Sequence, residues 1–297
     1  MSLQELRDQI VDTLMSEASE TGGWAYYAKK TSRIEPTCWA MLAVQASVRQ
    51  LDDVHRMYLL SRQRSDGLFS DQGDLPANLS WSALALLALA VLPSPPTDVR
   101  SKLTQSIIDL GGVTVRNSPV FKQNNELKGW PWIPDTFSWV EPTSWCVLAL
   151  KKTARSEPRF AKEAAARIGE GEQLLFDRVC ESGGWNFGNA NAFGTSLPPH
   201  VPTSAIGLLA LRDKTGHPVV EKSLAFVERH WRQELSGTAL ALSIICLKVY
   251  GRPTSDLEGA LAQQWERTGF LGNLAALAMA SLALSEDPSL LNPLKVA

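Results

Sequence analysis

The sequence has no long apolar run: the longest, residues 83–92, covers about half of a membrane span. Residues 1–17 alternate apolar and charged side chains at helical spacing and lack the apolar centre of a signal peptide. We therefore expect a cytoplasmic protein without a transmembrane segment.

Charge of one sign is also scarce. The chain has 29 Lys and Arg against 31 Asp and Glu, a formal net charge of -2, and the two signs are interspersed. A nucleic-acid-binding protein needs basic side chains gathered into a patch or stripe. We expect no nucleic-acid partner.

Cysteine and histidine are few, with four of each. The cysteines form neither the close pairs of a zinc site nor a dense disulfide pattern, so we interpret them as core thiols; they are Cys38, Cys146, Cys180 and Cys246. Three histidines fall in helices that we expect to be outer ones or at their starts, where surface positions are usual: His55, His217 and His230. His200 alone lies in a repeat loop. We expect no metal and no cofactor.

What the sequence does contain is an internal repeat. Its clearest copy, residues 129–150 (GWPWIPDTFSWVEPTSWCVLAL), has a Gly-aromatic turn, a polar loop and a Pro-Thr start to an Ala/Leu-rich helix. Residues 22–44 and 183–211 keep all three parts, whereas 66–89 and the segments from Ser236 and Gly269 have diverged. Self-similarity of this kind predicts a repeat fold.

Two kinds of helix alternate along the chain. Six segments have apolar residues at three-and-four spacing with charges opposite, as in half-exposed helices: 3–16, 51–62, 99–110, 158–179, 219–231 and 254–265. Six others are apolar nearly all round, as in buried helices: 37–47, 80–92, 143–152, 203–212, 238–250 and 271–284. The simplest closure is an all-α (α/α)6 toroid of six outer and six inner helices, forming one domain over residues 1–297.

The inner helices have distinctive starts. Pro36, Pro142 and Pro202 suit the first helical position, where no backbone donor is needed. Glu35 and Glu141 then sit beside unpaired N–H groups at the positive end of a helix dipole, so capping is one possible role. In a ring, however, the amino ends of the inner helices gather at one opening, the mouth. Both carboxylates should face it.

These residues resemble a known family. Gln63, Gly67 and Phe69, and more loosely Gln264, Gly269 and Leu271, are similar to the repeat of the squalene and oxidosqualene cyclases, whose toroid the protein prenyltransferase β subunits share. The resemblance covers nearly the whole chain, and it implies an isoprenoid, a hydrophobic small molecule, as ligand.

The family's catalytic motif is only partly present. In the cyclases an Asp-x-Asp-Asp-Thr segment opens an inner helix, and its middle Asp protonates the isoprenoid. The threonine matches Thr37, Thr143 and Thr203, and in this register the middle Asp matches Glu35 or Glu141.

Other family motifs are missing from the sequence. It contains no Asp-x-Asp-Asp and no DDxxD, and no position matches the Asp, Cys and His that bind zinc in the prenyltransferases. The chain is one toroid long, whereas the triterpene cyclases have a second helical domain and the prenyltransferases a helical partner subunit. A protein partner is therefore possible.

Aromatic residues concentrate in the turns and loops. Repeat packing accounts for Trp24 and Trp185, and an aromatic wall around a ligand accounts for the others. We expect Glu141, Glu35 and Asp135 to be catalytic, with Glu141 first. The expected substrate contacts are Trp130, Trp132, Phe137, Trp139, Trp145, Trp39, Tyr26, Phe187 and His200.

Three functions fit these residues. The first is an isoprenoid (terpene) cyclase in which a Glu starts cyclisation by protonation. The second is a toroid without catalysis that binds a lipid, a peptide or a partner protein. The third is a carbohydrate-processing (α/α)6 enzyme that uses a pair of carboxylates. The fold alone does not separate them.

Overall fold

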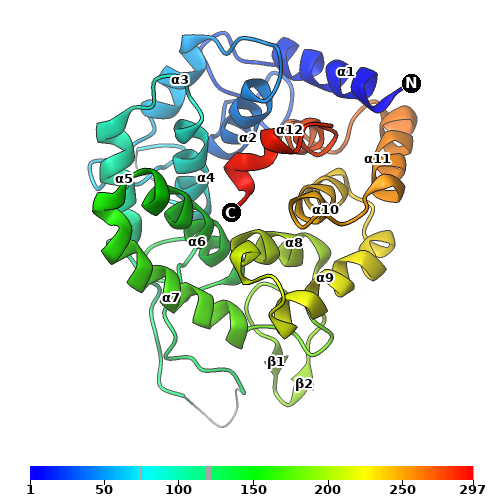
Figure 1. Ribbon diagram of the computed structural model, residues 1–297. Helices are drawn as coiled ribbons and strands as arrows, with labels where there is room; N and C mark the ends of the chain where they lie inside the picture. Colours follow the sequence, from blue (N-terminus) through cyan, green and yellow to red (C-terminus); the bar gives the residue numbers. More distant parts are fainter. Residues whose placement is uncertain (74, 118–121, 297) are drawn as a thin grey trace.

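The computed structural model describes residues 1–73, 75–117 and 122–296 (Figure 1). Six inner helices surround a common axis: α2 (Ile34–Gln45), α4 (Leu79–Ala90), α6 (Val140–Ser156), α8 (Val201–Ala210), α10 (Gly237–Val249) and α12 (Leu274–Ala283). Six outer helices enclose them: α1 (Leu3–Ser16), α3 (Asp53–Leu60), α5 (Thr97–Asp109), α7 (Ala161–Asp177), α9 (Pro218–His230) and α11 (Ser255–Thr268). The predicted all-α (α/α)6 toroid is confirmed.

The inner helices form a closed ring. Each contacts the next along the chain, and α12 returns to contact α2. Each outer helix packs mainly on one inner helix, and α1 packs mainly on α12, so the first α-helix of the chain covers the last (Figure 1).

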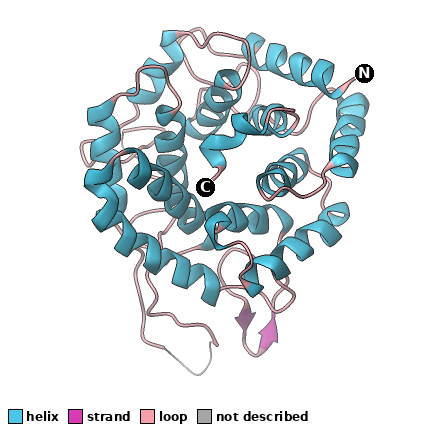
Figure 2. Ribbon diagram, in the orientation of Figure 1, coloured by secondary structure: helices cyan, strands magenta, loops and turns pink. Residues whose placement is uncertain are grey.

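Apart from α-helices and loops, the described chain contains a few short elements (Figure 2). The described residues include the 3-10 helices η1 (Pro158–Phe160), η2 (Arg212–Lys214), η3 (Trp231–Gln233) and η4 (Pro288–Leu294). One small hairpin pairs β1 (Asn191–Ala192) with β2 (Thr195–Ser196). No described helix is long and apolar enough to cross a membrane.

The Gly-aromatic turns lock each repeat to its neighbours. Their tryptophans Trp24, Trp130 and Trp185 are fully buried. Each indole N–H donates to a carbonyl of the preceding outer helix: Leu14, Ile107 and Leu175 respectively, at 2.7, 2.8 and 2.7 Å. Each backbone N–H donates to a hydroxyl in the first turn of the repeat's own inner helix: Thr37, Thr143 and Ser204, at 2.9, 3.0 and 2.9 Å. The packing role predicted for Trp24 and Trp185 is confirmed.

One histidine belongs to this packing. His55 is only 3% exposed. Its Nδ1 accepts a 3.0 Å hydrogen bond from the Gly23 N–H, and its ring centroid lies 4.2 Å from that of Trp24. The expectation of a surface position was wrong, because α3 presents this histidine to the turn of the first repeat.

The inner helices begin earlier than their prolines suggested. Pro36 and Pro142 are the third residues of α2 and α6, and Pro202 is the second of α8. The N–H groups of a first helical turn have no partner within the helix, so a proline is tolerated throughout that turn. The fourth residue supplies the hydroxyl for the turn, so Ser204, not Thr203, matches Thr37 and Thr143.

A series of hydrogen bonds joins the repeats at the mouth. The first N–H of an inner helix donates to the residue two places after the turn aromatic of the following repeat. The four bonds are Ile34 N to Asp71 Oδ1 (2.8 Å), Leu79 N to Trp132 O, Val140 N to Phe187 O and Leu274 N to Tyr26 O (2.9 Å each). The last joins the sixth repeat to the first. These four acceptor residues are thereby fixed at the mouth.

A second series joins the opposite, carboxyl-terminal ends of the inner helices. There a cationic side chain donates to a carbonyl of the following inner helix. The bonds are Lys151 Nζ to Ala210 O (2.8 Å), Arg212 Nε to Val249 O (2.8 Å) and Lys248 Nζ to Ala283 O (2.7 Å). Arg7 of α1 spans the closing joint, donating to Ser281 O (3.1 Å) and to Ala46 O. Cations at these ends also suit the helix dipoles.

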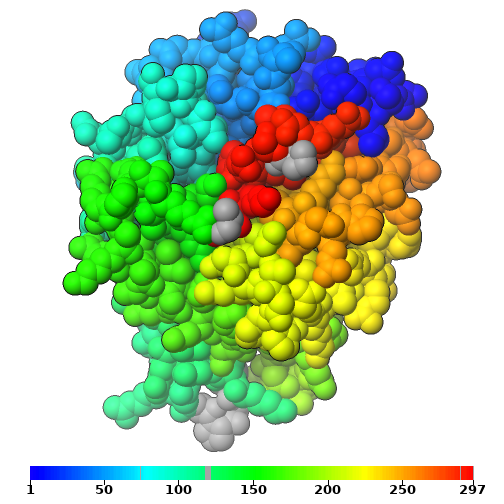
Figure 3. All heavy atoms as spheres, viewed as in Figure 1, coloured from blue at the N-terminus to red at the C-terminus, as the bar shows by residue number. Residues whose placement is uncertain are grey.

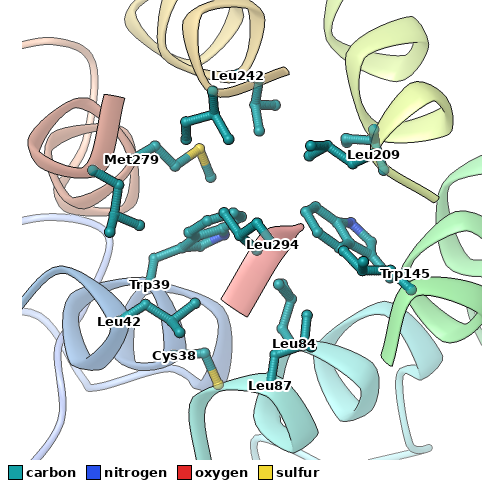
Figure 4. Packing of buried hydrophobic residues seen from close by; sticks show 14 of the residues in the cluster. Cys38, Trp39, Leu42, Leu84, Leu87, Trp145, Leu209, Leu242, Met279 and Leu294 are labelled. Atoms are coloured by element: carbon teal, nitrogen blue, oxygen red, sulfur yellow. The ribbon is translucent and has the colours of Figure 1, made fainter. Parts of the chain in front are cut away.

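Side chains fill the axis of the ring. Trp39 of α2 and Trp145 of α6 meet across it with ring centroids 5.6 Å apart, edge to face (Figure 4). Both are buried, as are Leu84, Leu242 and Met279 around them. At the carboxyl-terminal end, η4 places the buried Leu294 on the axis, and the C-terminal segment covers the centre of this face of the ring (Figures 3 and 4).

Candidate functional site: the carboxylate pair at the mouth

Two glutamates occupy equivalent positions at the mouth. Glu35 and Glu141 are the second residues of α2 and α6, one helical turn above Trp39 and Trp145. Between these helices lies α4, whose first turn contributes Ser80 and Trp81. Both carboxylates are partly accessible at the mouth while protein surrounds most of each side chain.

Burial controls the titration of Glu35. It raises the pKa of this carboxyl, because the charged form loses solvation, and the charge of Asp71 acts in the same direction. Hydrogen bonding from Tyr26 and Trp81 opposes the rise. The Tyr26 hydroxyl donates to Glu35 Oε2, and burial together with the Glu35 charge raises the pKa of that phenol.

Glu141 is held in a similar state. Burial raises its pKa to about 7, and the charge of Glu35 contributes to the rise. The side chains of Ser80 and Trp132 favour the charged form and limit the shift. Near neutral pH the Glu141 carboxyl is therefore divided between an acid that can donate a proton and a base that can accept one.

Neither glutamate caps its helix. The first N–H of α2 donates to Asp71 Oδ1 and that of α6 to Phe187 O, and within the described residues no backbone N–H donates to Glu35 or Glu141. The carboxylates are therefore not needed to satisfy the first N–H of either helix, and their partners are side chains of the mouth.

An aromatic wall extends outward from Glu141. Trp132 stacks on Trp139 with centroids 5.1 Å apart and meets Phe187 edge to face at 6.2 Å. The ring of Phe187 lies 4.9 Å from that of His200. Trp139, Phe187 and His200 line a recess of about 270 Å³ on the rim. A second recess of about 230 Å³ lies on the other side of Trp139, where Phe137 contributes to its lining.

The floor beneath the carboxylates contains a polar atom without a partner. Trp39 Nε1 is buried and makes no hydrogen bond within the described structure. Buried polar atoms are normally paired. Its position one helical turn below Glu35 indicates that a water molecule or a polar ligand atom completes this site.

The structure assembles most, but not all, of the predicted residues. Tyr26, Trp132, Trp139, Phe187 and His200 join the two glutamates at the mouth, and Trp39 and Trp145 form its floor. Trp130 is instead fully buried in its turn, with the Arg167 guanidinium 3.9 Å above its ring. Asp135 lies exposed in a loop with φ 63° and is not brought to the pair.

Three site residues were not foreseen: Asp71, Ser80 and Trp81. Asp71 is buried, pairs with Arg33 at 3.3 Å and contributes to the pKa rise of Glu35. A signal for it existed, because it stands two residues after Phe69, the position that Tyr26, Trp132 and Phe187 hold in the other repeats. No group of three or more His, Cys, Asp or Glu able to hold a metal ion occurs among the described residues.

The same fold occurs in solved proteins of different activities. The type II terpene cyclase MstE from Scytonema is similar over 91% of this chain and 79% of that chain, with 14% identity and a TM-score of 0.57. An alpha-amylase from Clostridium perfringens is similar over 94% of this chain and 96% of that chain, with 10% identity and a TM-score of 0.64.

A third similar structure is ent-copalyl diphosphate synthase from Streptomyces platensis, with 15% identity and a TM-score of 0.58. The likeness covers 84% of this chain and 50% of the synthase, so this chain spans half of that protein. No family profile and no curated protein matches the sequence. The predicted resemblance to the cyclase toroid is thus confirmed for the fold.

Proposed function

We propose that the mouth is a general-acid active site that acts on an isoprenoid, with Glu141 as the proton donor. The single observation that supports this most is the Glu141 carboxyl, whose pKa burial and the neighbouring Glu35 raise to about 7 beside the stacked Trp132 and Trp139. A carboxyl group with an ordinary pKa would be ionised at neutral pH and could not donate a proton.

In this proposal the protonated Glu141 transfers its proton to a terminal double bond of the substrate. The π electrons form the new C–H bond and leave a tertiary carbocation, and Glu141 becomes a carboxylate. Attack by the next double bond forms the ring and moves the positive charge along the chain. Loss of a proton from carbon to a carboxylate of the pair ends the sequence and restores the acid.

The surrounding side chains have defined roles in this scheme. The faces of Trp132 and Trp139 attract a carbocation that develops next to them. In its charged form Glu35, which accepts from Tyr26, favours the protonated form of Glu141; in its protonated form Glu35 is the second candidate donor. Because Trp39 and Trp145 close the axis below, the reacting end of the substrate lies at the mouth and its tail lies over the rim recess.

The filled axis also favours a second candidate, binding without catalysis. A toroid whose centre is closed offers its apolar surface at the rim, and Phe137 and Phe187 are each about half exposed there, at 52% and 51%. Glycan processing by the Glu35–Glu141 pair is the third possibility, since similar solved structures include an alpha-amylase.

Product analysis separates these functions. Purified protein is incubated with a panel of linear isoprenoids and their diphosphates, and in parallel with soluble glucans and xylans. We expect cyclic products from the isoprenoid panel, a loss of turnover in Glu141→Gln, and unchanged turnover in Glu266→Gln, a matched substitution of an exposed glutamate on α11.

Two results would contradict the cyclase proposal. One is turnover by Glu141→Gln equal to that of the wild type. The other is saturable binding of isoprenoids with no product from the wild-type protein under any condition of the panel, which would establish the binding function instead. Sugar release that depends on both glutamates would assign the pair to glycan processing.

A further inference from the structure

A second concave site lies at the end of the ring opposite the mouth. It is a recess of about 570 Å³ between the carboxyl-terminal ends of α4 and α6, beside the C-terminal segment. This volume falls within the usual range for small-molecule sites. The proposed chemistry at Glu35 and Glu141 makes no use of it, because those residues lie at the amino-terminal ends of α2 and α6, at the opposite end of the ring.

The inner part of the recess is apolar. Leu86, Leu87 and Ala90 belong to the last turns of α4, and Val91 and Pro95 follow in the connection to α5. Leu86 and Leu87 are buried, whereas Ala90 is exposed at the opening. A hydrocarbon chain placed along these side chains would cover apolar surface that is now open to water.

The rim of the recess is cationic. Lys152 and Arg100 line it, and Glu157, the carboxylate that pairs with Arg100, is not part of the described lining. Lys152 donates to two carbonyls of the C-terminal segment, Asn292 O at 2.7 Å and Lys295 O at 3.1 Å. Two neutral carbonyls do not neutralise an ammonium group, so positive charge remains beside the apolar floor.

Arg100 gives an independent indication of a ligand. Its side chain is buried, with 8% of the residue exposed, and its guanidinium pairs with Glu157 through Nη2 at 2.9 Å. The Nε–H of the same group is buried without a partner in the described structure. An unpaired donor of a charged group is costly unless an acceptor completes it.

We propose that this recess binds a single-chain amphiphile with an anionic oxygen headgroup, such as a fatty acid. The headgroup accepts hydrogen bonds from Lys152 and Arg100, and the alkyl chain lies along the end of α4. Charge complementarity selects an anion over a cation or a neutral alcohol, and the apolar floor selects a chain over a free inorganic ion.

Calorimetric titration with decanoate below its micelle concentration tests this proposal. We expect saturable binding to one site, weakened on the order of tenfold or more in Lys152→Met, since a hydrogen bond to a charged group is among the stronger ones. Ala90→Phe fills the opening without touching a cation, and it should weaken binding to a similar degree. Lys162→Met, on the exposed face of α7, is the matched control and should bind as the wild type does.

Further arms separate the possible ligands. Decyltrimethylammonium and inorganic phosphate should not compete with decanoate, and Glu141→Gln should bind it normally.

Equal decanoate affinity in wild type, Lys152→Met and Ala90→Phe would overturn the proposal, as would equal competition by the cationic amphiphile. Binding to phosphatidylglycerol vesicles through Lys152 without any binding of free decanoate would also overturn it, because a membrane headgroup would then be the ligand. Melting curves confirm that each variant is folded.

Discussion

At the scale of single residues, the raised pKa of Glu141 bears both on the proposed proton transfer and on the stability of the folded protein. Its carboxyl is buried beside Glu35, and its pKa is raised to about 7 in the folded protein. In the unfolded chain a glutamate titrates near its ordinary pKa of about 4.3. The folded state therefore binds the proton more tightly, so this residue favours folding below the unfolded pKa and opposes it increasingly as pH rises through the folded pKa.

This linkage makes a prediction about Glu141→Gln. At pH 8 we expect the variant to be more stable than the wild type by about 1–3 kcal/mol, because it removes a buried charge. The difference should shrink as pH falls and be lost near pH 4.5. Denaturant titrations at several pH values measure it, with Glu266→Gln as the exposed control. A variant that is less stable at pH 8 would show that the carboxylate holds the helix start.

At the scale of elements, the Gly-aromatic turn defines the repeat. Gly183 and Gly184 have φ values of 87° and 73°, in the left-handed region that residues with a side chain rarely adopt. A Cβ at Gly184 would lie 2.4 Å from Ser204 Oγ and 2.8 Å from Phe226 Cδ1. The turn thus needs glycine both for its backbone and for the contact with α8 and α9.

Substitution at Gly184 tests this double requirement. We expect Gly184→Val to lower the free energy of unfolding by about 1–3 kcal/mol or more through strain and the forced shift of Ser204. Gly194→Ala is the control, because Gly194 has a similar φ of 79° but open space around its Cα, so it isolates the backbone effect. Equal losses in the two variants, measured by denaturant titration, would show that the contact contributes nothing.

The sequence predicted elements better than the junctions between them. Apolar periodicity located all twelve helices because each buries a stripe or its whole surface. Their starts were placed about two residues late at Pro36 and Pro142, since a proline marks the first turn but not which residue of it. Glu35 and Glu141 were found because they precede those prolines.

The remaining site residues depend on neighbouring repeats. Asp71 reaches α2 from the second repeat, and Trp132 reaches α4 from the third. No local sequence pattern reveals a contact between a loop of one repeat and the inner helix of another until the closure of the ring and the register of the turns are known. Trp130 shows the converse, because its loop suggested a ligand contact while its position within the turn made it part of the core.

At the scale of the whole molecule, closure of the ring joins the two ends of the chain. Arg7 near the start donates to Ser281 O in α12 and to the O atom of Ala46, the residue that follows α2. This guanidinium is buried, and burial lowers its pKa. It therefore donates to carbonyls at the ends of α12 and α2, which are neighbours in the ring although they are far apart in the sequence.

We expect Arg7→Met to destabilise the protein by about 2–4 kcal/mol, because it leaves buried carbonyls without a charged donor. Arg56→Met is the control: Arg56 pairs with Asp53 on the surface of α3, and its loss should cost less than about 1 kcal/mol. Thermal and denaturant unfolding of both variants measure the difference. Similar small losses would show that the joint does not depend on this residue.

Removal of the last repeats tests closure directly. A protein ending at Glu234 lacks α10, α11 and α12, so α8 and α2 each lose an inner neighbour, and apolar faces that the ring buries become exposed. Since each repeat buries its apolar face against its neighbours, we expect this form to lose cooperative unfolding. A melting transition as sharp and as high as that of the full chain would contradict the interdependence of the repeats.

The hydrogen bonds that tie the starts of the inner helices to the next repeat are unevenly distributed around the mouth. The first N–H groups of α2, α4, α6 and α12 are tied to the next repeat, but among the described residues no such tie holds those of α8 and α10, where connections 231–236 and 269–273 are short. We expect the starts of α8 and α10 to move more than those of the other inner helices. Such a movement would widen the mouth and leave intact the hydrogen bonds from cationic side chains to carbonyls at the carboxyl-terminal ends of these helices. First-turn amides of α8 and α10 should then exchange hydrogen faster than those of α2 and α6. The ligand would then enter beside the starts of α8 and α10, on the side of the mouth that faces Glu35 and Glu141.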